Sequence, residues 1–182
     1  MSLRQSPPEN TTSYGYNPAR MTAKFWARFP HFLLLLFILG LDRWTKWLIH
    51  TRLLLNQTVL VIDGFFNITY VRNTGVAFGI LDPVQSPMKS TILAILTMGA
   101  VIGVIVYSWR TPLDQKLLQA ALSLILAGAL GNLYDRIRYG YVIDFIEVYF
   151  RNYHWPSFNV ADSAITTGVL LLAIEMLRKD GH

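Results

Sequence analysis

Two aspartates near the C-terminal end of the chain lie in or beside apolar segments, where a charged group is costly. Asp144 lies within "RYGYVIDFIEV", and Asp162 lies near the start of "FNVADSAITTGVLLLAIEML". A carboxylate at the depth of a lipid bilayer is expensive, so it is usually paired or functional. The two residues therefore indicate a chemical site. Two unrelated carboxylates that each cap a helix or a loop are the structural alternative.

Two carboxylates that meet in a partly dry site favour one chemistry in particular. Like charges a few ångströms apart cannot both ionise cheaply, so such a pair holds one proton between its members. The ionised member can act as a general base on a water molecule, while the protonated member polarises the scissile carbonyl. This is the chemistry of an aspartic peptidase.

Other hydrolytic chemistries find little support among the residue types present. The chain has no cysteine, which excludes disulfides, thiolate nucleophiles and cysteine-ligated metals. The histidines are scattered and lack the paired spacing of a metal site; they are His31, His50, His154 and His182. The sequence also contains no GxSxG motif of a serine hydrolase. We therefore expect neither a metal nor a cofactor.

Ion or proton translocation is the rival interpretation of intramembrane carboxylates. A proton relay needs acidic groups distributed through the depth of the membrane. The apolar middles of the segments 88–109, 117–137 and 160–177 contain none. This distribution favours an enzyme that works near the membrane surface over a transporter or a lipid-binding scaffold, which remains the alternative.

Further polar residues fall at positions that would bring them to the same side of the membrane. Asp42 and Lys46 are four residues apart, and Asn132, Asp135 and Arg136 have helical i, i+3, i+4 spacing, as do Asn159, Asp162 and Ser163. Asn73 and Gly75 belong to a turn that follows a predicted strand. We interpret these residues as groups that support the site or bind substrate.

Each of these groups also has a structural interpretation. Asp42 and Lys46 can form a neutralised ion pair that only fixes a helix, and Asp135 with Arg136 can form a structural salt bridge. Asn159 can serve as a helix N-cap. Spacing alone leaves these alternatives open.

The amino-acid composition indicates a membrane protein. Hydrophobic residues make up 53% of the 182 residues and charged residues only 15%, below the roughly 25% that is usual in soluble domains. The formal net charge is +5, but the basic residues form no dense run, so we expect contacts with lipid headgroups and no nucleic-acid partner. The length fits a single domain.

Apolar runs of sufficient length predict an all-α membrane protein with four transmembrane helices. The predicted spans are 28–50, 88–109, 117–137 and 160–177. Gly128 and Gly131 in the third span are expected to let helices approach closely. An even number of spans places both termini on one side. Lys and Arg are divided evenly between the two sides of the membrane, so the positive-inside rule does not decide whether the termini are cytoplasmic.

The remaining segments lie outside the predicted spans. Residues 1–27 are predicted to be a disordered tail that precedes a single domain of residues 28–182. Segment 58–81 has Asp63-Gly64 between two β-branched and aromatic runs, which predicts a hairpin in a small extramembrane sheet. Segment 145–155 is short, aromatic and partly charged, which is typical of a helix at the membrane interface.

Five motifs occur in an order that resembles bacterial lipoprotein signal peptidase, also called signal peptidase II. They are "DRWTK" at 42–46, "NTGVAF" at 73–78, "GALGNLYDR" at 128–136, "VIDF" at 142–145 and "FNVADS" at 158–163. Each motif alone is weak, but the set is specific and extends from about residue 30 to the C-terminus. The first 20 residues have no counterpart in it.

The resemblance implies an aspartic endopeptidase of the bacterial inner membrane. Such an enzyme removes signal peptides from prolipoproteins by cutting before a cysteine that carries a diacylglyceryl group. It implies four spans, a periplasmic β-cradle for 58–81 and a periplasmic interfacial helix for 145–155. It also implies termini in the cytoplasm, an active site near the periplasmic face and inhibition by globomycin.

The resemblance also assigns roles to residues. It implies that Asp144 and Asp162 are catalytic. The residues that it implies to support the site or bind substrate are Asp42, Lys46, Asn73, Gly75, Asn132, Asp135, Arg136 and Asn159. Two positions depart from the common pattern: Arg43 replaces a Gln and Val76 replaces an Ala, and neither is assigned a role.

Overall fold

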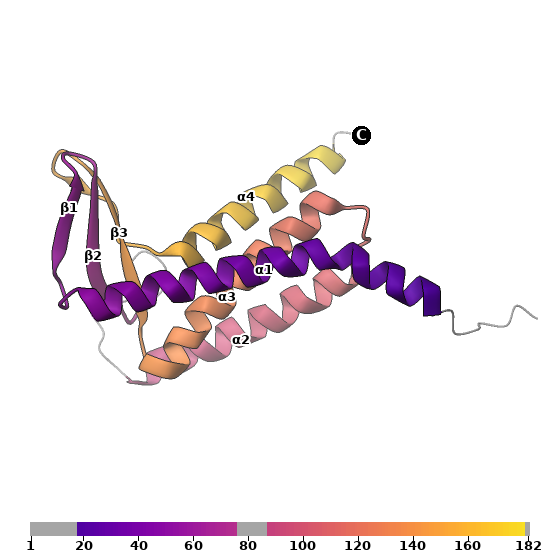
Figure 1. Ribbon diagram of the computed structural model, residues 1–182, viewed down its shortest axis with the longest axis horizontal. Coiled ribbons are helices and arrows are strands. Elements are labelled where there is room, and N and C mark those ends of the chain that lie inside the picture. The colour runs from indigo at the N-terminus through magenta and orange to yellow at the C-terminus, as the bar shows by residue number, and fades with distance from the viewer. Residues whose placement is uncertain (1–17, 76–86, 181–182) are drawn as a thin grey trace, which may run out of the picture.

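The computed structural model describes residues 18–75 and 87–180, and in this part four long helices lie side by side with a small antiparallel sheet across one end (Figure 1). The helices are α1 (Pro18–Arg52), α2 (Pro87–Arg110), α3 (Lys116–Tyr139) and α4 (Val160–Asp180). The strands are β1 (Thr58–Ile62), β2 (Phe66–Asn73), β3 (Val142–Phe150) and β4 (Tyr153–His154). The sheet lies at the end of the bundle where α1 and α3 finish and where α2 and α4 begin.

Three helices in the described part of the chain are long and apolar enough to cross a membrane. They are α2, α3 and α4, with mean hydropathies of 2.2, 1.6 and 1.7 over their most apolar stretches. Only 6% of that stretch of α2 is buried against protein, compared with 61% for α3, which places α3 at the centre of the bundle. The protein is therefore a membrane protein, and most of the apolar surface of α2 is left uncovered by the other described elements.

Helix α1 is longer than the other helices but is not among these three. Its second half carries Asp42, Arg43 and Lys46 within five residues, which lowers its hydropathy. The predicted fourth span, 28–50, is therefore helical as expected, but its position in the membrane is not established by length and composition.

Helices α3 and α4 approach so closely that a glycine is required between them. A Cβ atom at Gly128 would collide with the carbonyl oxygen of Ala161 and lie 2.7 Å from Cγ1 of Ile165. A Cβ atom at Gly131 would lie 2.6 Å from Oδ2 of Asp42. The predicted role of both glycines in close helix packing is confirmed.

Substitution of Gly128 by alanine is expected to destabilise the protein by about 3 kcal/mol or more, because a backbone carbonyl cannot turn away from the added methyl group. The matched control is Gly103→Ala in α2, where a Cβ would meet nothing within 4 Å and alanine is favoured in a helix by up to about 1 kcal/mol. Thermal unfolding in detergent measures both changes. Equal stability of the two variants would contradict this account of the helix contact.

The predicted hairpin is present, and it pairs with a strand that is distant in the sequence. Strands β1 and β2 are antiparallel and joined across Gly64, whose φ of +74° explains the glycine. Strand β2 pairs with β3, so that Val71 lies opposite Asp144. Residues 76–81 of the predicted sheet segment lie outside the described residues.

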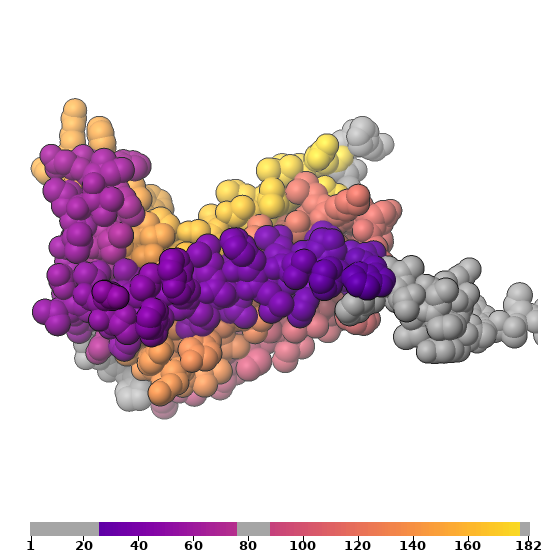
Figure 2. Space-filling view, in the orientation of Figure 1, coloured from indigo at the N-terminus to yellow at the C-terminus, as the bar shows by residue number. Residues whose placement is uncertain are grey.

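The molecular surface is recessed between the outer part of this sheet and α4 (Figure 2).

The prediction of an interfacial helix at 145–155 is wrong. Residues up to Phe150 belong to β3, and Tyr153 and His154 form β4. The sequence of β3, "VIDFIEVYF", is rich in β-branched and aromatic residues that favour a strand. Its backbone hydrogen-bonds to β2 on one edge and to Phe158 and β4 on the other. A helix this short would lack comparable support. Asp144 consequently lies on a strand and not in a loop.

The predicted disordered tail is too long at its C-terminal end. Helix α1 begins at Pro18, so residues 18–27 are helical, whereas residues 1–17 lie outside the described residues. Proline is well tolerated in a first helical turn because the N–H that it lacks has no partner there.

Candidate active site

Asp144 and Asp162 reach the sheet end of the bundle from different elements. Asp144 is the third residue of β3, and Asp162 lies in the first turn of α4. The side chain of Asn159 donates from Nδ2 to Oδ1 of Asp144 at 2.6 Å, and its backbone N–H donates to Oδ2 of Asp162 at 3.3 Å. The structure thus brings both carboxylates to one buried asparagine.

Asn159 is at the same time the cap of α4. Its Oδ1 accepts the backbone N–H of Asp162 at 2.9 Å, while the Asp162 carboxylate accepts the backbone N–H of Asn159. These reciprocal hydrogen bonds have the form of a capping box, which satisfies otherwise free donors at a helix start. The structural and functional interpretations of Asn159 are therefore compatible, because its Oδ1 serves the cap and its Nδ2 serves Asp144.

Two further asparagines hold the remaining oxygens of the pair. Nδ2 of Asn73 donates to Oδ2 of Asp144 at 2.9 Å, and Nδ2 of Asn132 donates to Oδ1 of Asp162 at 2.7 Å. Each amide is oriented by a second contact: Oδ1 of Asn73 accepts a hydrogen bond from the N–H of Gly75, and Oδ1 of Asn132 accepts one from Nζ of Lys46. Every carboxylate oxygen of the pair accepts at least one hydrogen bond, so both side chains are held in fixed orientations.

The environment of Asp144 favours its protonated form near neutral pH. Burial is the main cause and the nearby Asp162 carboxylate is the second, and together they raise the pKa of Asp144 from 3.8 to about 7. The amides of Asn73 and Asn159 act in the opposite direction but do not outweigh burial. Only 2% of Asp144 is exposed. The group is thus suited to hold a proton at the pH at which a cell operates.

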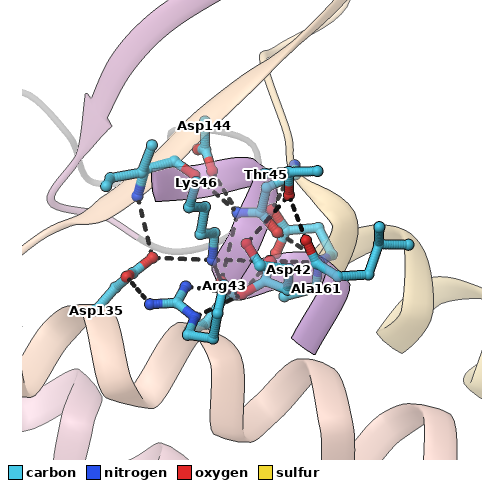
Figure 3. Close-up of polar contacts among 12 residues, drawn as sticks. Asp42, Arg43, Thr45, Lys46, Asp135, Asp144 and Ala161 are labelled. Carbon is cyan, nitrogen blue, oxygen red and sulfur yellow. Dashed lines mark hydrogen bonds and ion pairs between the residues drawn. The ribbon is translucent and has the colours of Figure 1, made fainter. Parts of the chain in front are cut away.

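A second set of charged residues, the ion cluster, consists of Asp42, Arg43, Lys46 and Asp135 (Figure 3). Asp42, Lys46 and Asp135 are buried, whereas the Arg43 side chain is 24% exposed. Nζ of Lys46 lies 3.1 Å from Asp42 and 2.9 Å from Asp135, and both carboxylates are fully buried. The predicted contact between Asp42 and Lys46 is confirmed. Two cations and two anions make the ion cluster neutral, which is the condition for burying charges at acceptable cost.

Arg43 is the one member of the ion cluster for which the sequence analysis predicted no role. Its guanidinium contacts Asp42 at 2.7 Å and Asp135 at 2.6 Å, and it lies over the ring of Tyr134 at 4.8 Å. Adjacent residues on a helix do not normally face each other, so spacing could not predict the contact with Asp42. The sequence signal that indicates a role for Arg43 is the charge count, because Lys46 alone cannot neutralise both Asp42 and Asp135.

Arg136 points elsewhere, although it follows Asp135 directly. Its Nη2 donates to the carbonyl oxygen of Gly75 at 3.2 Å, whereas Asp135 pairs with Arg43 and Lys46. The suggested salt bridge between Asp135 and Arg136 is therefore replaced by two separate contacts. Arg136 and Gly75 bring the turn after β2 to the end of α3, next to Asp144 and Asp162.

Comparisons of this chain with known proteins agree on one family. The model of the family described as "Signal peptidase (SPase) II" matches residues 34–178. A lipoprotein signal peptidase of Geobacter sulfurreducens is 51% identical over 142 residues, which cover 78% of this chain and 88% of the relative. One of Solibacter usitatus is 48% identical over 141 residues, which cover 78% and 86%.

A solved structure is similar over most of its length. It is described as a bacterial membrane enzyme, and it has a TM-score of 0.75 and 37% sequence identity, with 83% of this chain and 89% of that chain covered.

Proposed function

The chain belongs to the signal peptidase II family, and on that premise we propose that it is an aspartic endopeptidase whose catalytic residues are Asp144 and Asp162. Members of this family remove signal peptides from prolipoproteins, and the chain is a peptidase of this class. The observation that carries the aspartic mechanism is the pair of carboxylates that Asn159 holds from two elements. The family match favours this function over the transporter alternative.

In the proposed mechanism the two aspartates have different protonation states. Asp162 lies in the first turn of α4, where the helix dipole and the N–H of Asn159 favour a carboxylate. Asp144 carries the shared proton, in agreement with its raised pKa. Because the two groups interact, the proton belongs to the pair, and this assignment describes its dominant form.

Hydrolysis then proceeds through a tetrahedral intermediate. Asp162 removes a proton from a water molecule, whose oxygen attacks the carbonyl carbon on the N-terminal side of the modified cysteine. Asp144 donates its proton to the carbonyl oxygen. When the intermediate collapses, the C–N bond breaks, the cysteine nitrogen takes the proton that Asp162 received, and one hydroxyl proton of the intermediate returns to Asp144. The products are a free carboxyl group on the signal peptide and a free amine on the lipidated cysteine.

The remaining predicted residues have supporting roles in this proposal. Asn73, Asn132 and Asn159 orient the carboxylates through the hydrogen bonds described above. Arg136 donates a hydrogen bond to the carbonyl of Gly75, and in this proposal both residues bind the backbone of the signal peptide. Asp42, Lys46 and Asp135 support the site from beneath it through the ion cluster.

We further propose that α1 is a fourth span, so that residues 28–182 form one membrane domain of the bacterial inner membrane. The α1 helix runs alongside the three apolar helices (Figure 1), and its charges are neutralised within the ion cluster, which lowers the cost of their position. Both termini would then be cytoplasmic, and the sheet and active site would face the periplasm. The recess beside the sheet (Figure 2) is a suitable place for a lipidated peptide or a globomycin-type inhibitor.

The proposed function is tested with purified protein in detergent and a peptide that contains a diacylglyceryl-modified cysteine. We expect one cut, immediately before that cysteine, which mass spectrometry of both products identifies. The same peptide without the lipid is the matched control and should be cut far more slowly. Cleavage should persist in a metal chelator. Loss of activity in the chelator, restored by added metal, would contradict the aspartic mechanism.

The rate of cleavage is expected to fall as the pH rises through about 7, because Asp144 then loses the proton that the mechanism requires. Above that value the rate should drop about tenfold per pH unit. The linked stability has the same sign: the folded protein keeps this proton up to about pH 7, whereas the unfolded chain releases it near 3.8. The contribution of Asp144 to the free energy of unfolding therefore decreases as pH rises between these values.

The measurement is a pH profile of kcat with the melting temperature recorded at each pH, so that loss of folded protein is separated from loss of the proton. A rate that stays constant or rises between about pH 6 and about pH 9 would rule out a protonated Asp144.

A further inference from the structure

Each carboxylate of the ion cluster holds the backbone directly before one of the proposed catalytic residues. Oδ2 of Asp135 accepts the N–H of Ile143 at 3.3 Å, and Ile143 precedes Asp144. Oδ1 of Asp42 accepts the N–H of Ala161 at 3.0 Å, and Ala161 precedes Asp162 (Figure 3). The start of β3 and the start of α4 are thus each tied to one buried carboxylate.

Lys46 contacts one oxygen of each of these two carboxylates. Its ammonium group is already shared among Oδ1 of Asp42, Oδ2 of Asp135 and Oδ1 of Asn132, at 3.1, 2.9 and 2.8 Å. An ammonium has three N–H donors, so all of them are engaged. The other oxygen of each carboxylate has to be held by a different group.

Arg43 contacts those two remaining oxygens. Its Nη2 and Nε donate to Oδ2 of Asp42 at 2.7 and 3.2 Å, and its Nη1 donates to Oδ1 of Asp135 at 2.6 Å. The guanidinium is planar and its donors have a fixed geometry, and stacking on Tyr134 restricts the plane further. Arg43 is therefore a rigid link between the carboxylate that holds Ile143 and the one that holds Ala161.

We propose that Arg43 is a positioning residue for catalysis, which sets the distance and orientation between Asp144 and Asp162 by joining the two carboxylates that hold their backbones. This inference rests on the proposed catalytic role of the pair. Without Arg43 two buried carboxylates face a single ammonium, repel each other and shift the starts of β3 and α4 relative to one another. A shift of this kind changes the geometry of the reacting groups and lowers kcat more than it changes substrate binding.

The test compares Arg43→Met with Arg43→Lys in steady-state cleavage of the lipidated peptide. Arg43→Met is expected to lower kcat by about 10- to 100-fold, since small misplacements of reacting groups have effects of this size, with KM within about twofold. Arg43→Lys restores the charge but can link the carboxylates less rigidly, so kcat should recover in part. The matched control is Arg138→Met. Arg138 is an exposed arginine near the C-terminal end of α3, and it stacks on Tyr139.

A double variant separates positioning from stability. Arg43→Met combined with Asp135→Asn leaves one anion and one cation, Asp42 and Lys46, so its melting temperature should recover towards that of the wild type. Its kcat should stay low because the rigid guanidinium link between Asp42 and position 135 is still missing. Recovery of kcat together with stability would overturn the inference, as would Arg43→Met with the same kcat as Arg138→Met.

Asp144→Asn in the same assay distinguishes the two proposals. If this variant is inactive while Arg43→Met is fully active, only the role of Arg43 is wrong. If Asp144→Asn cleaves the peptide, the aspartic mechanism itself fails and the role of Arg43 fails with it.

Discussion

Replacing Asp144 or Asp162 by asparagine is expected to abolish cleavage while the protein remains folded and inserted in the membrane. The substitution keeps the size of the side chain but removes both the ionised base and the shared proton. Loss of a catalytic group that acts within a unit typically costs about 10⁴-fold or more in kcat. Because the two residues act together, the double variant should be no worse than either single variant. The measurement is cleavage of the lipidated peptide alongside the melting temperature of each variant.

Two controls decide whether such a loss is specific. Asp63→Asn changes a carboxylate in the β1–β2 turn, where Asn-Gly suits the hairpin as well as Asp-Gly, and full activity is expected. Asp135→Asn alters the ion cluster and should lower activity or stability without abolishing cleavage. Substantial turnover by Asp144→Asn or Asp162→Asn would end the aspartic mechanism for this chain.

Replacing Lys46 by methionine is expected to give the largest loss of stability among the charged residues of the ion cluster. Lys46 is only 1% exposed and contacts Asp42, Asp135 and Asn132. Removal of one partner from a buried ion pair costs about 3–5 kcal/mol, because the opposite charge remains buried without compensation. Of the four members of the ion cluster, one cation, Arg43, would then remain with two carboxylates. Reversible unfolding in mixed detergent measures the change.

The same helix provides the control for this prediction. Arg52 lies in the last turn of α1 and is exposed, so Arg52→Met should change the free energy of unfolding by less than about 1 kcal/mol. Lys46→Met combined with Asp135→Asn restores a neutral ion cluster and should recover part of the loss. A Lys46→Met variant as stable as Arg52→Met would show that the ion cluster does not need its ammonium.

The sequence by itself determined the elements whose signals are local. Apolar runs predicted four long helices, and the Asp63-Gly64 turn between β-branched residues predicted the hairpin of β1 and β2. The spacing of Asp42 and Lys46 predicted a contact that the structure contains. These features depend on residues within a few positions of one another, so hydrophobic periodicity and turn chemistry are sufficient to reveal them.

Only the tertiary structure decided the features that depend on distant partners. The segment 145–155 is compatible with a short amphipathic helix until β2 supplies the hydrogen bonds of a neighbouring strand, and the paired residues are about eighty positions apart in the sequence. The roles of the carboxylates are decided in the same way. Asp135 becomes a structural anion because Arg43 and Lys46 of α1 form ion pairs with it, whereas Asp144 accepts hydrogen bonds from the neutral amides of Asn73 and Asn159 and lies near the Asp162 carboxylate. Arg43 had no recognisable role until α3 brought Asp135 within reach, because a side chain's partner across a helix interface leaves no trace in the spacing of its own segment.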